Sequence, residues 1–126
     1  HPLVGKARNG FLRLAGASRA RVVVMDVPLL FETGGMAGYH AVVVVSAPHF
    51  VQRSRALRRP GMTTERFASI VQKQVPDQLK CRQADFIVFS GLGKRSALIR
   101  ICRILRMARA GLVWRGKLRL KGQRSA

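Results

Sequence analysis

The feature that most constrains the fold is a short apolar run at residues 22–26, which reads Val-Val-Val-Met-Asp. A run of this length, rich in β-branched residues, predicts a strand buried inside a parallel sheet. Pro28 has no N–H group to donate and therefore ends the strand. Ligands of open α/β sheets bind beyond the carboxyl ends of the strands, so we expect a site near Asp26 and Glu32. The alternative is that Asp26 only caps the turn before Pro28.

Two further apolar runs predict strands, at Ala41–Ala47 and at Phe86–Phe89. The helical spacing of apolar residues predicts helices around these strands, at residues 3–17, 49–59, 64–74, 76–84 and 96–110. Thr63 or Thr64 can cap the third of these helices. Strands that alternate with helices indicate an α/β fold. We therefore predict a partial parallel sheet of three strands with flanking helices.

The charge of the chain is strongly unbalanced, because its 126 residues include 24 Lys and Arg against 5 Asp and Glu, a net charge of +19. No acidic residue follows Asp85. Such a balance suits a polyanionic ligand, which can be nucleic acid, anionic lipid or a nucleotide. The pattern predicts one domain over residues 1–110 and a weakly ordered basic tail over residues 111–126.

Cysteine usage and hydropathy set further expectations. Cys81 and Cys102 have no closely spaced partner, so they indicate neither a disulfide framework nor a metal site. A reduced, cytoplasmic setting is therefore expected. No apolar run reaches the roughly 18 residues of a membrane span, and no membrane partner is predicted.

One stretch has the composition of a phosphate-binding loop. Residues 91–96 read Gly-Leu-Gly-Lys-Arg-Ser. In a true P-loop, however, a glycine would stand at the position of Val88 and a Ser or Thr at the position of Arg95, where its hydroxyl reaches Mg²⁺. We interpret the stretch as a turn between a strand and a helix.

The helix predicted at residues 49–59 carries a group of arginines. Arg55 and Arg59 are four residues apart and share one helical face with Gln52. Two guanidinium groups on one face could clamp a phosphate chain. The alternative is an ordinary solvated face.

Several short motifs of the sequence, in this order and at this spacing, resemble those of the dephospho-coenzyme A kinases. They are His1-Pro2-Leu3-Val4, Asp26-Val27-Pro28-Leu29-Leu30-Phe31-Glu32-Thr33-Gly34, Gln52-x-x-Arg55-x-x-x-Arg59-Pro60-Gly61-Met62-Thr63, Gln74 and Lys80-x-x-x-Ala84-Asp85-Phe86-Ile87-Val88. The resemblance implies transfer of the γ-phosphoryl group of ATP to the ribose 3′-hydroxyl of dephospho-coenzyme A, the last step of coenzyme A synthesis. It also implies a P-loop kinase-like fold with a helical substrate region and a mobile lid.

The resemblance assigns ligand-binding roles by matching position. It implies a substrate-side loop at Pro28, Leu29, Leu30 and Glu32, and contacts to ATP and its phosphates from Gln52, Arg55, Arg59, Gln74, Lys80, Ser90 and Gly91. The chain would be the C-terminal part of the enzyme, and the P-loop and the catalytic base would lie in the N-terminal part. We therefore expect no catalytic or metal-binding residue in this chain and no activity from it alone. ATP and Mg²⁺ are expected as cofactors of the complete enzyme.

The resemblance also implies a strand order of 2-3-1-4-5, of which this chain would supply the third, fourth and fifth strands. The first strand would separate residues 22–26 from residues 41–47. Without it, these two strands are expected either to pair directly in parallel or to flank a gap. We favour direct pairing, because it satisfies backbone groups at little cost in loop entropy.

Two alternatives of other classes stay open. The chain could be a small basic module that binds nucleic acid non-specifically through its tail. Aromatic stacking platforms are scarce there, because the tail contains only Trp114. The chain could also be a remnant with no selected function.

Overall fold

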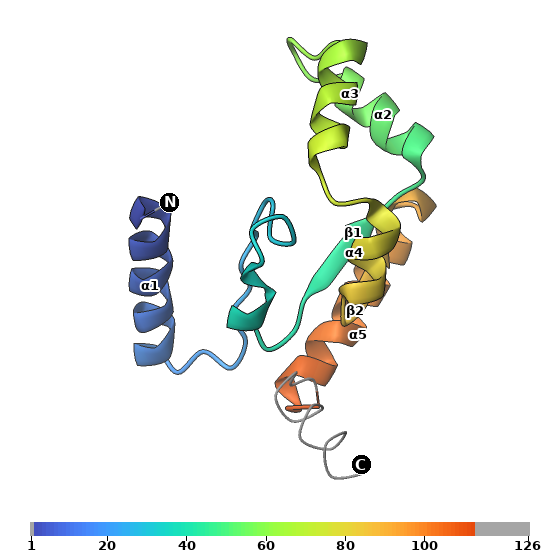
Figure 1. Cartoon of the computed structure of the whole chain (residues 1–126). Helices are drawn as coiled ribbons and strands as arrows, with labels where there is room; N and C mark the ends of the chain where they lie inside the picture. Colours follow the sequence, from blue (N-terminus) through green and yellow to red (C-terminus); the bar gives the residue numbers. More distant parts are fainter. Residues whose placement is uncertain (1, 113–126) are drawn as a thin grey trace, which may run out of the picture.

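The computed structural model of the chain describes residues 2–112 (Figure 1). Its elements, in chain order, are α1 (Pro2–Ala17), the 3-10 turn η1 (Gly35–Gly38), β1 (Val43–Ser46), α2 (His49–Leu57), α3 (Thr64–Lys73), α4 (Asp77–Gln83), β2 (Phe86–Phe89), the 3-10 turn η2 (Ser90–Leu92) and α5 (Lys94–Arg109). The five predicted helices are therefore confirmed, with small differences at their ends. The predicted basic tail falls outside the described residues beyond Leu112.

The sheet consists of β1 and β2, which run parallel with Val43 opposite Phe86 and Ser46 opposite Phe89. The helices α2, α3 and α4 lie between these strands in the sequence, as expected of a crossover between parallel strands. α4 packs against β1 and α5 packs against β2 (Figure 1). A small core is buried here, made of Val42, Val44, Ala47, Val88 and Ile104. The α/β class is therefore confirmed.

The prediction of a third strand at residues 22–26 is wrong, and so is its direct pairing with Ala41–Ala47. The segment is irregular, and Val24 is 74% exposed. A strand needs a neighbour to pair its N–H and C=O groups, and in residues 2–112 the sheet contains β1 and β2 alone. The parallel pairing of β1 with β2 agrees with their neighbouring places in the strand order implied by the resemblance.

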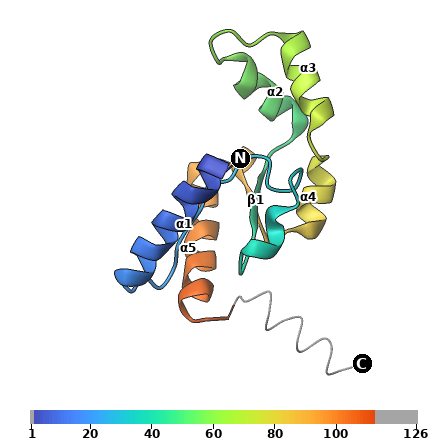
Figure 2. The same cartoon turned by 60° about the vertical axis from the view of Figure 1, so that its left-hand side comes forward.

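The helices α2 and α3 form a hairpin that projects from the sheet (Figures 1 and 2). Gly61 takes a φ of +75° in the turn between them, a conformation that glycine adopts without steric cost. The Thr63 hydroxyl accepts the Arg66 N–H at 3.1 Å, so Thr63 is the N-terminal cap of α3. The rings of His49 and Phe67 lie 5.8 Å apart and join the two helices. The hairpin thus has internal contacts of its own.

The helix α1 stands apart from the sheet in Figure 1. Its apolar spacing is helical, as predicted, but Leu3 and Leu14 are exposed. Among the helices of the described part of the chain, none combines the length and the apolar character that a membrane span requires.

Candidate functional site

The predicted substrate-side residues lie in a tight turn that precedes η1. Leu29 has a φ of +57°, and its carbonyl accepts both the Thr33 N–H at 3.1 Å and the Thr33 hydroxyl at 2.9 Å. The Leu30 carbonyl accepts the Gly35 N–H at 3.1 Å. Pro28 and Leu29 are exposed, whereas Leu30 is half-buried. The turn therefore presents Pro28 and Leu29 to solvent and leaves Glu32 to contact other elements.

Glu32 contacts the linker between α3 and α4. Its Oε1 accepts the backbone N–H of Val75 at 2.8 Å and lies 3.1 Å from Nζ of Lys80. The side chain of Glu32 is 14% exposed and that of Lys80 is 21% exposed. The structure thus brings together two predicted site residues that the resemblance assigned to different ligands. They pair with each other.

The protonation of Glu32 reflects this environment. Burial raises the pKa of its carboxyl group, but the N–H groups of Val75 and of Glu32 itself, together with Lys80, more than offset that effect. The pKa is therefore held below its ordinary value of 4.5. The second oxygen, Oε2, is buried and has no hydrogen-bond partner among the described residues.

The α2–α3 hairpin is joined to the sheet by two chain segments, which we call its stems. At the stem that leads from β1 into α2, side chains of α2 contact the ends of the strands. Arg55 donates from Nη1 to the Ser90 hydroxyl and from Nη2 to the Ser90 carbonyl, both at 3.0 Å. The side-chain amide of Gln52 donates to the Ala47 carbonyl at 2.7 Å. Gly91 approaches Pro48 so closely that a Cβ atom on Gly91 would lie 2.9 Å from the Pro48 ring. Gln52, Arg55, Ser90 and Gly91 thus meet at the carboxyl ends of β1 and β2.

Arg59 and Gln74 take part in neither the contacts of Glu32 nor those of Arg55. α2 ends at Leu57, so Arg59 lies beyond the helix and does not share a helical face with Arg55. The prediction of one helix over residues 49–59 is therefore too long, because a residue that precedes proline, here Pro60, is disfavoured in helical conformation. Gln74 caps the C-terminal end of α3 and is exposed.

Two acidic residues that hold the fold together were not predicted from the sequence. Asp77 accepts the Ser46 hydroxyl at 2.6 Å, and Asp85 accepts the Val42 N–H at 2.7 Å. Both carboxylates fix α4 and its neighbouring backbone to β1. The available signal was Ser46, a polar residue within an apolar run, since a buried hydroxyl needs a partner.

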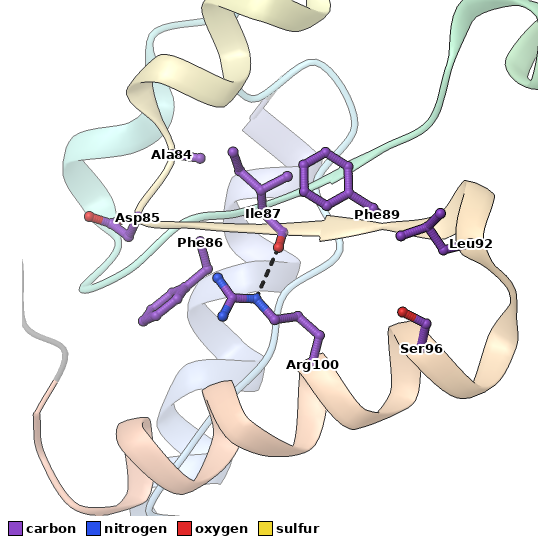
Figure 3. Close-up of a pocket in the computed structure, with 8 residues that line it drawn as sticks. All are labelled: Ala84, Asp85, Phe86, Ile87, Phe89, Leu92, Ser96 and Arg100. Atoms are coloured by element: carbon purple, nitrogen blue, oxygen red, sulfur yellow. Dashed lines mark hydrogen bonds between the residues drawn. The ribbon is translucent and has the colours of Figure 1, made fainter.

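An open groove of about 320 Å³ lies between β2 and α5 (Figure 3). Arg100 donates from Nε to the Ile87 carbonyl at 3.2 Å, and its guanidinium carbon lies 6.0 Å from the centre of the Phe86 ring. In Figure 3 the side chains of Ile87 and Phe89 lie on the side of β2 opposite to Arg100. None of the predicted site residues lines this groove.

The carboxylates of the described residues do not gather into a cluster. Within residues 2–112, the structure contains no group of three or more His, Cys, Asp and Glu side chains that could hold one. The carboxylates of Glu32, Asp77 and Asp85 instead accept hydrogen bonds from protein donors.

The parallel strand pair with flanking helices is consistent with a kinase-like fold. The family model for dephospho-CoA kinase matches residues 1–92, and the chain belongs to this family. A dephospho-CoA kinase from Rhodospirillum rubrum is 49% identical over 112 residues, which cover 89% of this chain and 53% of the relative. One from Mesorhizobium japonicum is 48% identical over 105 residues, covering 83% of this chain and 53% of the relative.

The match covers most of this chain but only about half of each relative. A further dephospho-CoA kinase, from Agrobacterium fabrum, is 44% identical over 105 residues, covering 83% of this chain and 54% of the relative. The chain thus spans about half the length of the curated relatives it matches. No solved structure matches the chain significantly.

Proposed function

We propose that the chain is the acceptor-side and lid portion of a dephospho-CoA kinase, which transfers the γ-phosphoryl group of ATP to the ribose 3′-hydroxyl of dephospho-CoA. Membership of the family supports this proposal. The observation that carries it is the meeting of Gln52, Arg55, Ser90 and Gly91 at the carboxyl ends of two parallel strands. In open α/β sheets, ligands bind at these ends.

Arg55 is the best-placed residue for a phosphate. A guanidinium group has five N–H donors in a planar fork, and two donor nitrogens of Arg55 are directed at Ser90. These bonds fix the orientation of the guanidinium and leave further N–H groups for a phosphate oxygen. The side chain is exposed, so a nucleotide can reach it. Under this proposal Arg55 binds the phosphates of ATP, while Ser90 and Gly91 lie near the adenine.

We expect the chain alone not to carry out phosphoryl transfer. The reaction needs backbone N–H groups and a Lys around the transferred phosphates, together with Mg²⁺. The 126-residue sequence contains no P-loop pattern. The loss of a single charge-stabilising donor already costs about 3 kcal/mol. We expect the chain alone to bind ATP weakly and to give no turnover. The expected location of the enzyme is the cytoplasm.

Calorimetric titration of the purified chain with ATP tests the role of Arg55. The parent chain is expected to bind more tightly than Arg55→Ala, by about tenfold, because a charge-assisted hydrogen bond contributes on the order of 1.5 kcal/mol. Arg53→Ala is the matched control, since Arg53 is an exposed arginine on the same helix. Equal affinity for the parent and Arg55→Ala, or equal losses in both variants, would contradict the proposal.

A second candidate function is favoured by one specific observation, the cationic character of α5. The helix carries Lys94, Arg95, Arg100, Arg103, Arg106 and Arg109, and the sequence from Phe86 to its end contains no acid. Such a surface would bind nucleic acid non-specifically, with an affinity that falls steeply with salt. Retention on immobilised single-stranded DNA at rising salt tests it, with the parent chain compared with a variant that carries Arg103→Gln and Arg106→Gln in α5. Salt-resistant retention that is unchanged in this variant would argue against electrostatic binding.

A further inference from the structure

The second stem of the α2–α3 hairpin is a short extended linker. α3 ends at Lys73, and α4 begins at Asp77. Gln74 and Pro76 are both extended, with ψ angles of 151° and 142°. Hinges are usually a few residues between regular elements that absorb changes in φ and ψ. The linker is therefore the place where the hairpin can turn relative to α4.

The helix on the far side of this linker is fixed to the sheet. The Asp77 carboxylate accepts the Ser46 hydroxyl of β1 at 2.6 Å, and α4 packs against β1. At the other end of α4, Asp85 accepts the Val42 N–H, and the Val42 carbonyl accepts the N–H of Asp85. Motion at the linker would therefore move α3 and leave α4 in place.

Glu32 is the side chain that holds the linker. The N–H of Val75 points to Oε1 of Glu32 at 2.8 Å, and Pro76 has no N–H to offer. Lys80, in α4, lies 3.1 Å from the same oxygen. Glu32 therefore connects the hinge, the fixed helix and the turn at residues 29–34. Both side chains of the pair are largely buried, so water competes little for these contacts.

We propose that Glu32 is a positioning residue which, with Lys80, locks the hinge at Val75 and sets the orientation of the α2–α3 hairpin. Because Glu32 belongs to the 29–34 turn, this lock couples the turn to the hairpin. The interpretation of the α2–α3 hairpin as a lid and of the 29–34 turn as a substrate-side loop rests on the proposed function. The lock at the hinge does not depend on it. The resemblance assigned Glu32 to substrate and Lys80 to phosphate, but their pairing gives both a role in holding the hinge.

The unpaired oxygen of Glu32 agrees with a lock that opens. Oε2 is buried and has no partner among the described residues. A carboxylate with one oxygen unsatisfied is held less firmly than one that is fully hydrogen-bonded. The contact that holds the hairpin in its observed orientation is therefore of limited stability.

The distance between α3 and α5 reports the orientation of the hairpin. Cys102 is exposed on α5 and can carry one spin label, and Ser69→Cys on the exposed side of α3 can carry the other. Cys81→Ala removes the remaining thiol. Double electron–electron resonance on the full chain then gives the distribution of label distances. Amide hydrogen exchange at Val75 gives the state of the lock.

We expect one narrow distance distribution in the labelled parent chain. Glu32→Ala and Lys80→Met should broaden it and shift its mean by several ångströms, with exchange at Val75 about tenfold faster or more. Glu32→Gln keeps an oxygen acceptor for Val75 and should give an intermediate result. Lys80→Arg keeps the cation and should restore the parent distribution.

The controls separate the lock from general unfolding and from catalysis. Glu65→Gln removes an exposed carboxylate from the first turn of α3 and should leave the distribution unchanged. Slow exchange at Val44 and Val88 shows that the sheet is intact. Parent-like distances in both Glu32→Ala and Lys80→Met, whether or not exchange at Val75 is faster, overturn the proposal. No turnover is measured, so the result does not depend on whether the chain acts as a kinase.

Discussion

Arg55 and Ser90 are 35 residues apart in the sequence and are joined by two hydrogen bonds of 3.0 Å. The Ser90 hydroxyl also donates to the Ser46 carbonyl at 3.4 Å. Arg55 therefore ties α2 to the carboxyl ends of both strands, while Glu32 holds the opposite stem of the hairpin. Residues that the resemblance assigned to ligands thus attach the hairpin to the sheet and to the 29–34 turn.

Replacement of Arg55 should lower stability even without ligand. Arg55→Ala removes both hydrogen bonds to Ser90, and we expect the free energy of unfolding to fall by about 1 kcal/mol, a modest value because the side chain is exposed. Urea unfolding followed by circular dichroism measures the change. Arg53→Ala on the same helix should stay within about 0.5 kcal/mol of the parent. Equal stability of all three proteins would show that the Arg55–Ser90 link does not support the fold.

A methyl group at position 91 should be destabilising. The Cβ atom of Gly91→Ala would lie 2.9 Å from the Pro48 ring, and a proline ring cannot rotate out of the way. Overpacking of this kind costs about 1–3 kcal/mol. Gly10→Ala is the matched control, because its Cβ would meet nothing within 4 Å and alanine favours the α1 helix by about 1 kcal/mol. The prediction fails if thermal unfolding shows Gly91→Ala to be as stable as the parent.

The contribution of Glu32 to stability should depend on pH with a defined sign. Burial raises its pKa, but Val75, its own backbone N–H and Lys80 hold the pKa below the ordinary 4.5. The folded state thus binds the proton less readily than the unfolded state. The stabilisation is present above pH 4.5 and is lost as the pH falls through the lowered pKa. Urea unfolding across this range should show a steeper loss for the parent than for Glu32→Gln. Parallel curves would contradict the assignment.

The two cysteines should react at different rates. The pKa of the Cys81 thiol is raised above its ordinary value of 9.0, chiefly by burial. A hydrogen bond with Ser46 lowers this pKa, and the nearby Asp77 carboxylate raises it. Cys102 is exposed. Because the thiolate is the reactive form, iodoacetamide should modify Cys102 several-fold faster than Cys81 in the native protein. In denaturant the two rates, followed by mass spectrometry, should converge. Faster native modification of Cys81 would contradict the structure.

The helices could be predicted because their signals are local. The spacing of apolar residues and the cap at Thr63 are properties of neighbouring residues, and the structure confirms them. Residues 22–26 behave differently. Their composition is that of a buried strand, but strand formation depends on a partner elsewhere in the chain, and the described residues provide none beside them.

The candidate site was only partly predictable for the same reason. Resemblance supplied the names of Glu32 and Lys80, but no local pattern indicates that they contact each other and the Val75 N–H. The bond between Arg55 and Ser90 is likewise a product of the crossover between two parallel strands. Contacts of this kind follow from the tertiary arrangement, which local spacing does not encode.

The most direct test of the central claim is phosphoryl transfer by a chimaera. Residues 1–110 of this chain would replace the matching segment of the Rhodospirillum rubrum relative, so that the remainder of that protein supplies what this chain lacks. With MgATP, the chimaera should phosphorylate dephospho-CoA, Arg55→Ala should reduce its kcat/KM about a hundredfold, and the 126-residue chain alone should give no product. A folded chimaera that binds ATP without phosphorylating dephospho-CoA would contradict the account, as would turnover by the chain alone.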